Sequence, residues 1–381
     1  MTFDELGVHA SILPILKKNN FKIPTPIQRR GIPAILNQND VLGIAKTGSG
    51  KTASFVLPIL TLLQRLPAKE KNREIDVLVL VPTRELAVQV GDVFNEYGKH
   101  LPKPIKTMSV YGGVSINPQM KTMFGTNVLV ATPGRLLDLV SHNALDLSKV
   151  RALILDEADK MLNLGFQDEM REIFKLLPEV RQNLLFSATL SKDLESIQNV
   201  LLDNPQIIEI QQVETDIDTI NLSGYFVTDD RRGPLLRYLI KEKEMDQVLV
   251  FTSSAQKADR VAAKLTKNGI EAYPIHGKKS QGARQSALEA FKTGKIKVLV
   301  ATDLLSRGID IAGLPFVINY ELPRSPKDFI HRVGRTGRAD ENGLAISFVD
   351  RAEIKHFKVI LKKMKRYVDM AETDDLDLHG Y

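Results

Sequence analysis

The sequence predicts an α/β protein with two parallel sheets, each covered by helices. Short β-branched and aliphatic runs alternate with helical patterns along the 381 residues, which is typical of parallel sheets covered by helices. A repeat supports two copies of one fold: residues 79–83 resemble residues 248–252 at an offset of 169, and residues 128–132 recur unchanged as residues 298–302 at an offset of 170. Short apolar runs also recur by chance, so coincidence is the alternative to a duplication.

The strands are expected where short apolar runs stop at polar, Gly or Pro residues. In the first half these runs are residues 41–44, 77–81, 128–131, 152–155, 184–186 and 207–210, and in the second half 248–251, 273–275, 298–301 and 316–319. We therefore place a first domain at 1–211, a polar linker at 212–220 and a second domain at 221–366. An acidic tail at 367–381 is expected to be disordered.

Composition excludes several classes of protein. The hydrophobic fraction of 43% and the charged fraction of 26% are those of a soluble globular chain. The absence of cysteine excludes disulfides and thiolate metal sites. The start has no basic segment followed by an apolar core, and no apolar run reaches membrane-spanning length, so a cytoplasmic protein without membrane contact is expected. A net charge of +6 mildly favours a polyanionic partner.

The segment after the first strand predicts a nucleoside triphosphate site. It comprises Ala45, Lys46, Thr47, Gly48, Ser49, Gly50, Lys51 and Thr52. Its glycines let backbone N–H groups point at phosphate oxygens, next to a helix N-terminus that favours negative charge. Lys51 would reach the β- and γ-phosphates, and Thr52 would hold Mg²⁺. Ala45 replaces the usual first glycine, and the alternative is a Gly-rich turn before an ordinary helix.

Two adjacent carboxylates follow the strand at 152–155. At the carboxyl edge of a parallel sheet, Asp156 would hold Mg²⁺ through water, and Glu157 would orient and deprotonate the attacking water. The alternative is that residues 156–159 are exposed acids that cap a helix.

Asp-Glu-Ala-Asp at 156–159 resembles the motif that names the DEAD-box RNA helicases, and the likeness covers nearly the whole chain. The resemblance implies two tandem RecA-like domains. Residues 21–28 look like the family's adenine-reading motif, in which Phe21 stacks on the base, Gln28 donates to and accepts from its edge, and Thr25 contributes to the site. ATP is therefore expected as the nucleotide.

The resemblance also implies residues that couple hydrolysis to RNA. Ser187 and Thr189 would link their hydroxyls to the acidic motif at Asp159. The implied RNA contacts are Pro82, Thr83, Arg84, Gly112, Gly113, Thr132, Pro133, Gly134 and Arg135 in the first domain, and Thr252, Gln281, Arg284, Thr302 and Asp303 in the second. Hydroxyls, guanidinium groups and glycine N–H groups near strand ends can hold a sugar-phosphate backbone without reading bases.

Residues 331–338 contain three arginines, which are costly to bury without anions. By resemblance, Arg335 and Arg338 are arginine fingers for the γ-phosphate, and His331 links to the acidic motif. Gly308 and Asp310 would help to recognise ATP. A solvated basic loop is the alternative.

The expected activity is RNA-stimulated ATP hydrolysis with local, non-processive opening of RNA duplexes by a monomer. A likeness to the bacterial RhlE-like subgroup implies ribosome assembly or RNA turnover, with ribosomal or RNA-decay proteins as partners. The alternatives are an ATP-gated RNA clamp with little unwinding, and a P-loop ATPase acting on another substrate such as DNA. The lysines of residues 355–366 are interpreted as a solvated helix face or as an RNA contact.

Overall fold

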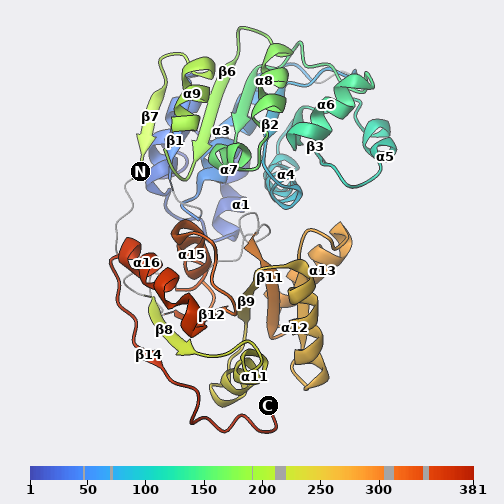
Figure 1. The fold of residues 1–381 in the computed structure, drawn as a ribbon. Helices are drawn as coiled ribbons and strands as arrows, with labels where there is room; N and C mark the ends of the chain where they lie inside the picture. The colour runs from blue at the N-terminus through green and yellow to red at the C-terminus, as the bar shows by residue number, and fades with distance from the viewer. Residues whose placement is uncertain (46–47, 69–71, 191, 211–219, 304–312, 338–342) are drawn as a thin grey trace. The chain divides into compact units, whose positions relative to one another are not determined.

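The chain folds into two compact units, Met1–Gln212 and Val213–Tyr381, in a computed structural model (Figure 1). The structure describes all residues except 46–47, 69–71, 191, 211–219, 304–312 and 338–342. Each unit has its own parallel sheet and its own cores. Among the described residues, no helix is both long and apolar enough to span a membrane.

The first unit is built on a seven-stranded parallel sheet in the order β3-β4-β2-β5-β6-β1-β7. The strands are β1 Val41–Ile44, β2 Val77–Leu80, β3 Thr107–Val110, β4 Val128–Ala131, β5 Ala152–Leu155, β6 Gln182–Ser187 and β7 Gln206–Glu209. Strands β1, β2, β4, β5 and β6 are buried along their whole length. They are covered on both faces, which is why all but β6 are nearly continuous apolar runs in the sequence. Strand β6 also contains the buried polar residues Gln182, Asn183 and Ser187.

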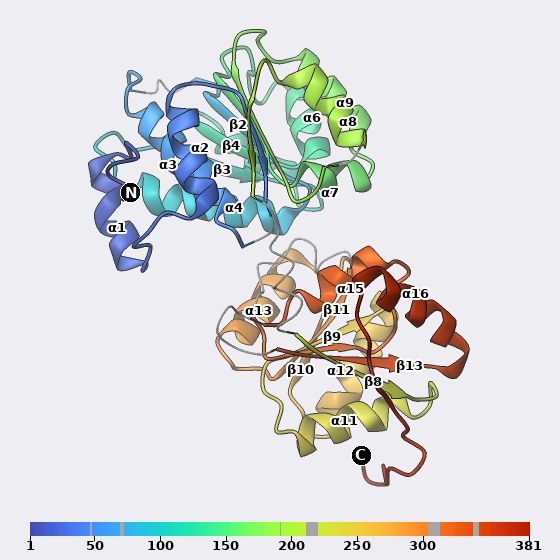
Figure 2. The ribbon, with the colours of Figure 1, turned by 90° about the vertical axis from the view of Figure 1, so that its left-hand side faces the viewer.

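Helices cover both faces of this sheet (Figure 2). They are α1 Leu13–Lys18, α2 Pro26–Leu36, α3 Lys51–Leu63, α4 Arg84–Gly98, α5 Ile116–Lys121, α6 Pro133–Ser141, α7 Ala158–Asn163, α8 Gln167–Lys175 and α9 Lys192–Leu201. Helices α1 to α4 share one core, in which Phe55 packs on Phe94 and Phe186. Helices α6 to α9 supply the core on the opposite face.

The second unit repeats this arrangement. Its strands are β8 Asn221–Phe226, β9 Val248–Thr252, β10 Ala272–Ile275, β11 Val298–Thr302, β12 Phe316–Asn319, β13 Leu344–Val349 and β14 Met370–Ala371, and its helices are α11 Arg232–Glu242, α12 Ala255–Lys267, α13 Gln281–Lys292, α15 Pro326–Val333 and α16 Ile354–Met364. The order β10-β11-β9-β12-β13-β8-β14 matches the first sheet position by position. The predicted duplication is confirmed.

The register of the repeat differs from the prediction. Val77 faces Val128 in the first sheet, and Val248 faces Val298 in the second. Because residues 128 and 298 correspond, residue 77 corresponds to residue 248, an offset of 171 rather than 169. The side-chain period of a strand is two, so a shift of two residues keeps the same face and is invisible in an apolar run.

The acidic end of the chain is not the disordered tail that its composition predicts. Met370 and Ala371 pair with Gly224 and Tyr225 of β8, and the Thr373 side chain is 1% exposed and donates to the Phe226 carbonyl at 2.5 Å. A Cβ on Gly224 would lie 2.3 Å from Met370 Sδ, so the missing side chain makes room for the strand. Backbone pairing on a sheet edge does not require an apolar sequence. Most of the predicted linker lies outside the described residues.

Candidate active site

Six loops of the first unit carry predicted site residues at one edge of the sheet. They follow β3, β4, β2, β5, β6 and β1, which are successive neighbours in the sheet. All strands are parallel, so their carboxyl ends meet at this edge, where ligands of open α/β sheets bind. In this order the loops carry three implied RNA segments, the acidic motif, residues 187–189 and the phosphate loop.

The phosphate loop enters α3 through a left-handed glycine. Gly48 and Gly50 have φ of 84° and 91°, and Gly50 is the N-cap of α3. Lys51 is 6% exposed and donates from Nζ to the Ala45 carbonyl at 2.6 Å. Ser49 Oγ is buried and has no hydrogen-bond partner among the described residues, as expected for a group that binds a ligand. Residues 46 and 47 lie outside the described part of the chain.

Gln28 connects the adenine-type motif to this loop. Its side chain is fully buried, its Oε1 accepts from the Thr25 N–H at 2.9 Å, and its Nε2 donates to the Gly50 carbonyl at 3.2 Å. A Cβ on Gly50 would lie 2.5 Å from Gln28 Nε2. Glycine is therefore required at residue 50 by its backbone angle and by the approach of Gln28. Phe21 is 41% exposed, which leaves its ring available for stacking.

The acidic motif places two carboxylates side by side in a buried position. Asp156 is 2% exposed and Glu157 6% exposed. Burial raises the pKa of Asp156 to about 6, the charge of Glu157 adds to the rise, and Lys51 and Lys160 oppose it. Glu157 has the left-handed φ of 53°, unusual for a residue with a side chain. Its Oε1 is 2.6 Å from Lys160 Nζ, and its Oε2 is buried with no partner in the described part of the chain.

Thr189 reaches the acidic motif directly. Its Oγ1 donates to Asp159 Oδ2 at 3.0 Å, and its backbone N–H donates to Ser187 Oγ at 3.3 Å. Ser187 is fully buried and donates in turn to the Thr189 carbonyl at 2.8 Å. The three residues named as coupling residues thus form one hydrogen-bonded chain from β6 to α7.

The implied RNA residues of the first unit lie in the segments that follow β2, β3 and β4. Thr83 caps α4 by accepting from the Leu86 N–H at 3.3 Å, and Arg84 lies so close to Gly113 that a Cβ there would be 2.0 Å from its Nη2. Gly112 and Gly134 face open space. Thr132 and Pro133 are the N-cap and first residue of α6, and Pro82 follows β2 in a buried position.

Arg135 is engaged within the first unit in the described conformation. It is 7% exposed and donates to Gln119 Oε1 at 2.9 Å and to the Val114 carbonyl at 2.7 Å. Since its guanidinium holds the segment after Gly113, Arg135 positions this loop in the described conformation.

In the second unit, Arg332 is the centre of a buried network that the sequence analysis missed. It is 1% exposed. Its Nε and Nη2 donate to the two carboxylate oxygens of Asp303 at 2.5 and 2.7 Å, its Nη1 donates to the Glu321 carbonyl at 2.6 Å, and its Cζ lies 5.0 Å from the Phe251 ring centre. The sequence offered one signal for this network, namely that an arginine is costly to bury without an anion. The carboxylate of Asp303 is the anion that pairs with Arg332. Asp303, an implied RNA contact, is thus the ion-pair partner of Arg332 in the described conformation.

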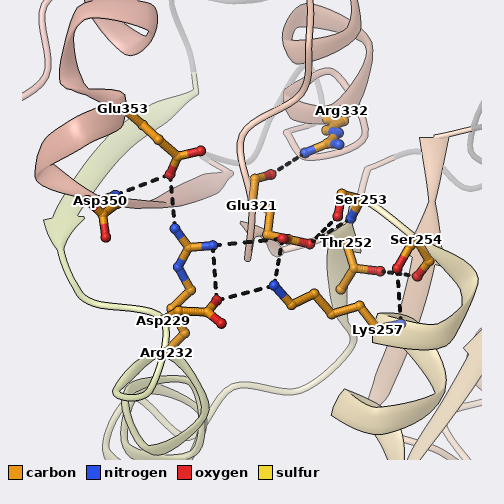
Figure 3. Close-up of polar contacts among 10 residues, drawn as sticks. All are labelled: Asp229, Arg232, Thr252, Ser253, Ser254, Lys257, Glu321, Arg332, Asp350 and Glu353. Carbon is orange, nitrogen blue, oxygen red and sulfur yellow. Dashed lines mark hydrogen bonds and ion pairs between the residues drawn. The ribbon is translucent and has the colours of Figure 1, made fainter.

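Glu321 ties the adjoining loops together (Figure 3). Its Oε2 accepts from the Ser253 N–H at 2.8 Å and the Ser253 hydroxyl at 2.7 Å, and its Oε1 lies 2.8 Å from Lys257 Nζ. Burial alone would raise the pKa of Glu321, but Lys257 and Ser253 hold it below its ordinary value. Lys257 also pairs with Asp229 at 3.2 Å, and Arg232 pairs with Glu353 at 2.9 Å. These contacts fix the loop after β9 to the loop after β12.

The remaining predicted residues of this unit are partly described. Thr252 is fully buried and donates to the Ser254 carbonyl at 3.3 Å, and Thr302 ends β11. Gln281 begins α13, and Arg284, on the same helix, is 5% exposed. Arg335 is 9% exposed and follows α15, whose last turn contains His331. Gly308, Asp310 and Arg338 lie outside the described residues.

A phosphate loop and an acidic pair on one edge of a parallel sheet define the first unit as a P-loop nucleotide-binding domain, and the second unit repeats its fold. The family comparisons agree. Residues 25–197 match the model for DEAD/DEAH box helicases, and residues 232–340 match the helicase conserved C-terminal domain.

Relatives match along nearly the whole chain. The DEAD-box ATP-dependent RNA helicase CshA of Bacillus cereus is 37% identical over 377 residues, covering 99% of this chain and 70% of the relative. The DEAD-box ATP-dependent RNA helicase RhpA of Helicobacter pylori is 37% identical, covering 99% of this chain and 75% of the relative. Saccharomyces cerevisiae Dbp5 bound to RNA and ADP BeF3 superposes with a TM-score of 0.84 at 31% identity, covering 100% and 97%. A DEAD box protein of Methanococcus jannaschii superposes with a TM-score of 0.54 at 37% identity, covering 97% of this chain and 99% of that protein.

The chain belongs to the DEAD-box ATP-dependent RNA helicase family, whose members hydrolyse ATP. Its two units are RecA-like domains, as the resemblance implied.

Proposed function

We propose that the chain is an RNA-stimulated ATPase that opens short RNA duplexes locally. The observation that carries this proposal is the order of loops on the first sheet. The acidic motif after β5 stands between the implied RNA loops after β4 and β2 and the phosphate loop after β1. The hydrogen bond from Thr189 to Asp159 then offers a direct route by which hydrolysis can affect neighbouring loops.

ATP and Mg²⁺ fit the residues present. Lys51 would hold the phosphates, while Thr52 and Asp156 would hold the ion. Two protein oxygens suit Mg²⁺, because this ion takes one or two of them and completes its shell with phosphate and water. When bound, Mg²⁺ neutralises charge that develops on the phosphates. Glu157, whose Oε2 is buried without a partner, would accept a proton from the attacking water.

The second unit would complete the reaction. Arg335 and Arg338 are proposed as arginine fingers, a role worth about 10³ to 10⁵ in rate in phosphoryl-transfer enzymes. His331 would join the acidic motif, and Gly308 and Asp310 would contact ATP. We further propose a cytoplasmic monomer that acts in ribosome assembly or RNA turnover with proteins of those processes.

The first test measures ATP turnover at low salt with and without single-stranded RNA, with single-stranded DNA as comparator. We expect RNA to stimulate turnover and DNA to do so weakly. Equal stimulation by DNA would favour the broader P-loop ATPase, and no stimulation by RNA would contradict the proposal. Arg335→Ala should lose nearly all turnover while it retains RNA binding, and Glu157→Gln should retain ATP and RNA together.

A second test concerns coupling. Thr189→Val keeps the shape of the side chain but removes the 3.0 Å hydrogen bond to Asp159, so unwinding of a short duplex should fall more than RNA-stimulated turnover. An equal fall in both would argue against coupling through Thr189. A wild-type protein that hydrolyses ATP on RNA but opens no duplex would instead be the ATP-gated clamp.

A further inference from the structure

Helix α16 presents a stripe of lysines that the catalytic motifs do not use. Lys355, Lys358, Lys362 and Lys363 are all exposed, and with Val359 they follow the spacing i, i+3, i+4, i+7, i+8 of one helix face. The opposite face is buried in the core of the second unit through Phe357, Ile360 and Leu361. The four lysines and Val359 are called the α16 stripe below.

The charge of the α16 stripe is not compensated locally. Residues 354–364 contain no acidic side chain, and across the described ranges the four lysines take part in no ion pair. Two of the flanking acids are engaged elsewhere: Glu353 pairs with Arg232 at 2.9 Å, and Glu372 with Arg351 at 2.6 Å. Solvated helix faces usually mix both signs, because like charges three or four residues apart repel. The uncompensated stripe therefore favours an anionic partner.

Apolar and aromatic groups accompany these lysines. Val359 is 54% exposed, and Tyr367, just beyond the end of α16, is 82% exposed. Lysines beside an exposed aromatic ring suit a nucleic-acid strand, since phosphates meet the ammonium groups and a base can stack on the ring. From Lys355 to Lys363 the helix rises about 12 Å, so the lysines can meet more than one phosphate of an extended strand.

The stripe begins near the carboxyl edge of the second sheet. His356 Nε2 lies 2.8 Å from the carbonyl of Pro323, in the loop between β12 and α15. The same loop holds Glu321, which fixes Ser253 beside the implied RNA residue Thr252. RNA leaving that edge would therefore meet the N-terminal end of α16 first.

We propose that the α16 stripe and Tyr367 bind the backbone of RNA that extends beyond the strand held by the helicase motifs. This accessory site rests on the proposed function, because it needs RNA as the ligand. It would strengthen binding to long RNA without contributing to the chemistry of ATP hydrolysis.

The experiment compares RNA-stimulated ATP turnover with single-stranded RNA of about 12 and about 40 nucleotides at about 50 and about 200 mM salt. One variant carries Lys355→Gln, Lys358→Gln, Lys362→Gln and Lys363→Gln. The matched control carries Lys17→Gln, Lys18→Gln, Lys264→Gln and Lys267→Gln, which remove the same charge from other exposed positions. A second variant, Tyr367→Ala, tests stacking without any change of charge.

For the stripe variant, we expect the RNA KM to rise about tenfold for the long RNA at low salt and to change little for the short one, with kcat unchanged. Each lost lysine contact should reduce the salt slope by about 0.7, or about 3 for all four. The control should resemble the wild type. A wild-type KM that is independent of RNA length, or an equal effect in the control, would overturn the accessory site. If the short RNA did not stimulate ATP turnover of the wild-type protein, that result would instead contradict the proposed function.

Discussion

Asp156→Asn should stabilise the protein while it abolishes ATP turnover. Folding raises the pKa of this buried carboxyl from 3.8 to about 6, so the folded state holds its proton more tightly than the unfolded state does. The contribution of this carboxyl to the free energy of unfolding is therefore fully present below about pH 4 and is lost as the pH rises through about 6. Two pH units correspond to about 3 kcal/mol. Asparagine cannot ionise, yet its Oδ1 can still accept the Glu157 N–H bond of 3.0 Å.

The variant should therefore gain about 3 kcal/mol at about pH 7 and about half of that at about pH 5, in metal-free and nucleotide-free buffer. Hydrogen exchange of the β5 amides, Ala152–Leu155, reports the free energy of opening of the first unit without assuming that both units unfold together. Exposed Asp374→Asn is the control and should show no such pH dependence. A loss of stability in Asp156→Asn at neutral pH, or a gain that does not change with pH, would refute the reasoning.

Two further substitutions test how the loops are held. Gly50→Ala combines a φ of 91° with a Cβ 2.5 Å from Gln28 Nε2; it should raise the KM for ATP several-fold and cost about 1 to 3 kcal/mol of stability. Gly48→Ala has a similar φ but open space around its Cβ, so a larger loss there than at Gly50 would contradict the role of Gln28. Arg332→Lys keeps the charge but loses the paired bonds to Asp303, and denaturant unfolding should show a loss of at least about 2 kcal/mol; an unchanged midpoint would show that the network contributes little.

Much of the fold could be predicted because buried parallel strands are apolar along their whole length. All the predicted strands are present, and most of them are short runs dominated by Val, Ile and Leu; residues 273–275, Tyr-Pro-Ile, are an exception. The missed strands are β3, β8, β13 and β14. Strands β3 and β8 contain Thr, Ser, Asn or Gly, and their sequences are less apolar than those of the central strands. The ordered tail was missed because its strand depends on Gly224, which lies far away in sequence.

Some features of the candidate site could likewise be predicted from the sequence, and others could not. The sequence by itself determined the phosphate loop, the acidic pair and the duplicated parallel sheets, because each depends on residues that are consecutive or regularly spaced. The family resemblance already implied the link from Thr189 to Asp159. Only the tertiary structure decided that Gln28 closes on Gly50 and that Arg135 is engaged within the protein. Gln28 lies on α2 and Gly50 after β1, whereas Arg135 and its partner Val114 follow β4 and β3. The physical reason is that a parallel sheet brings the carboxyl ends of its strands together whatever their separation in sequence.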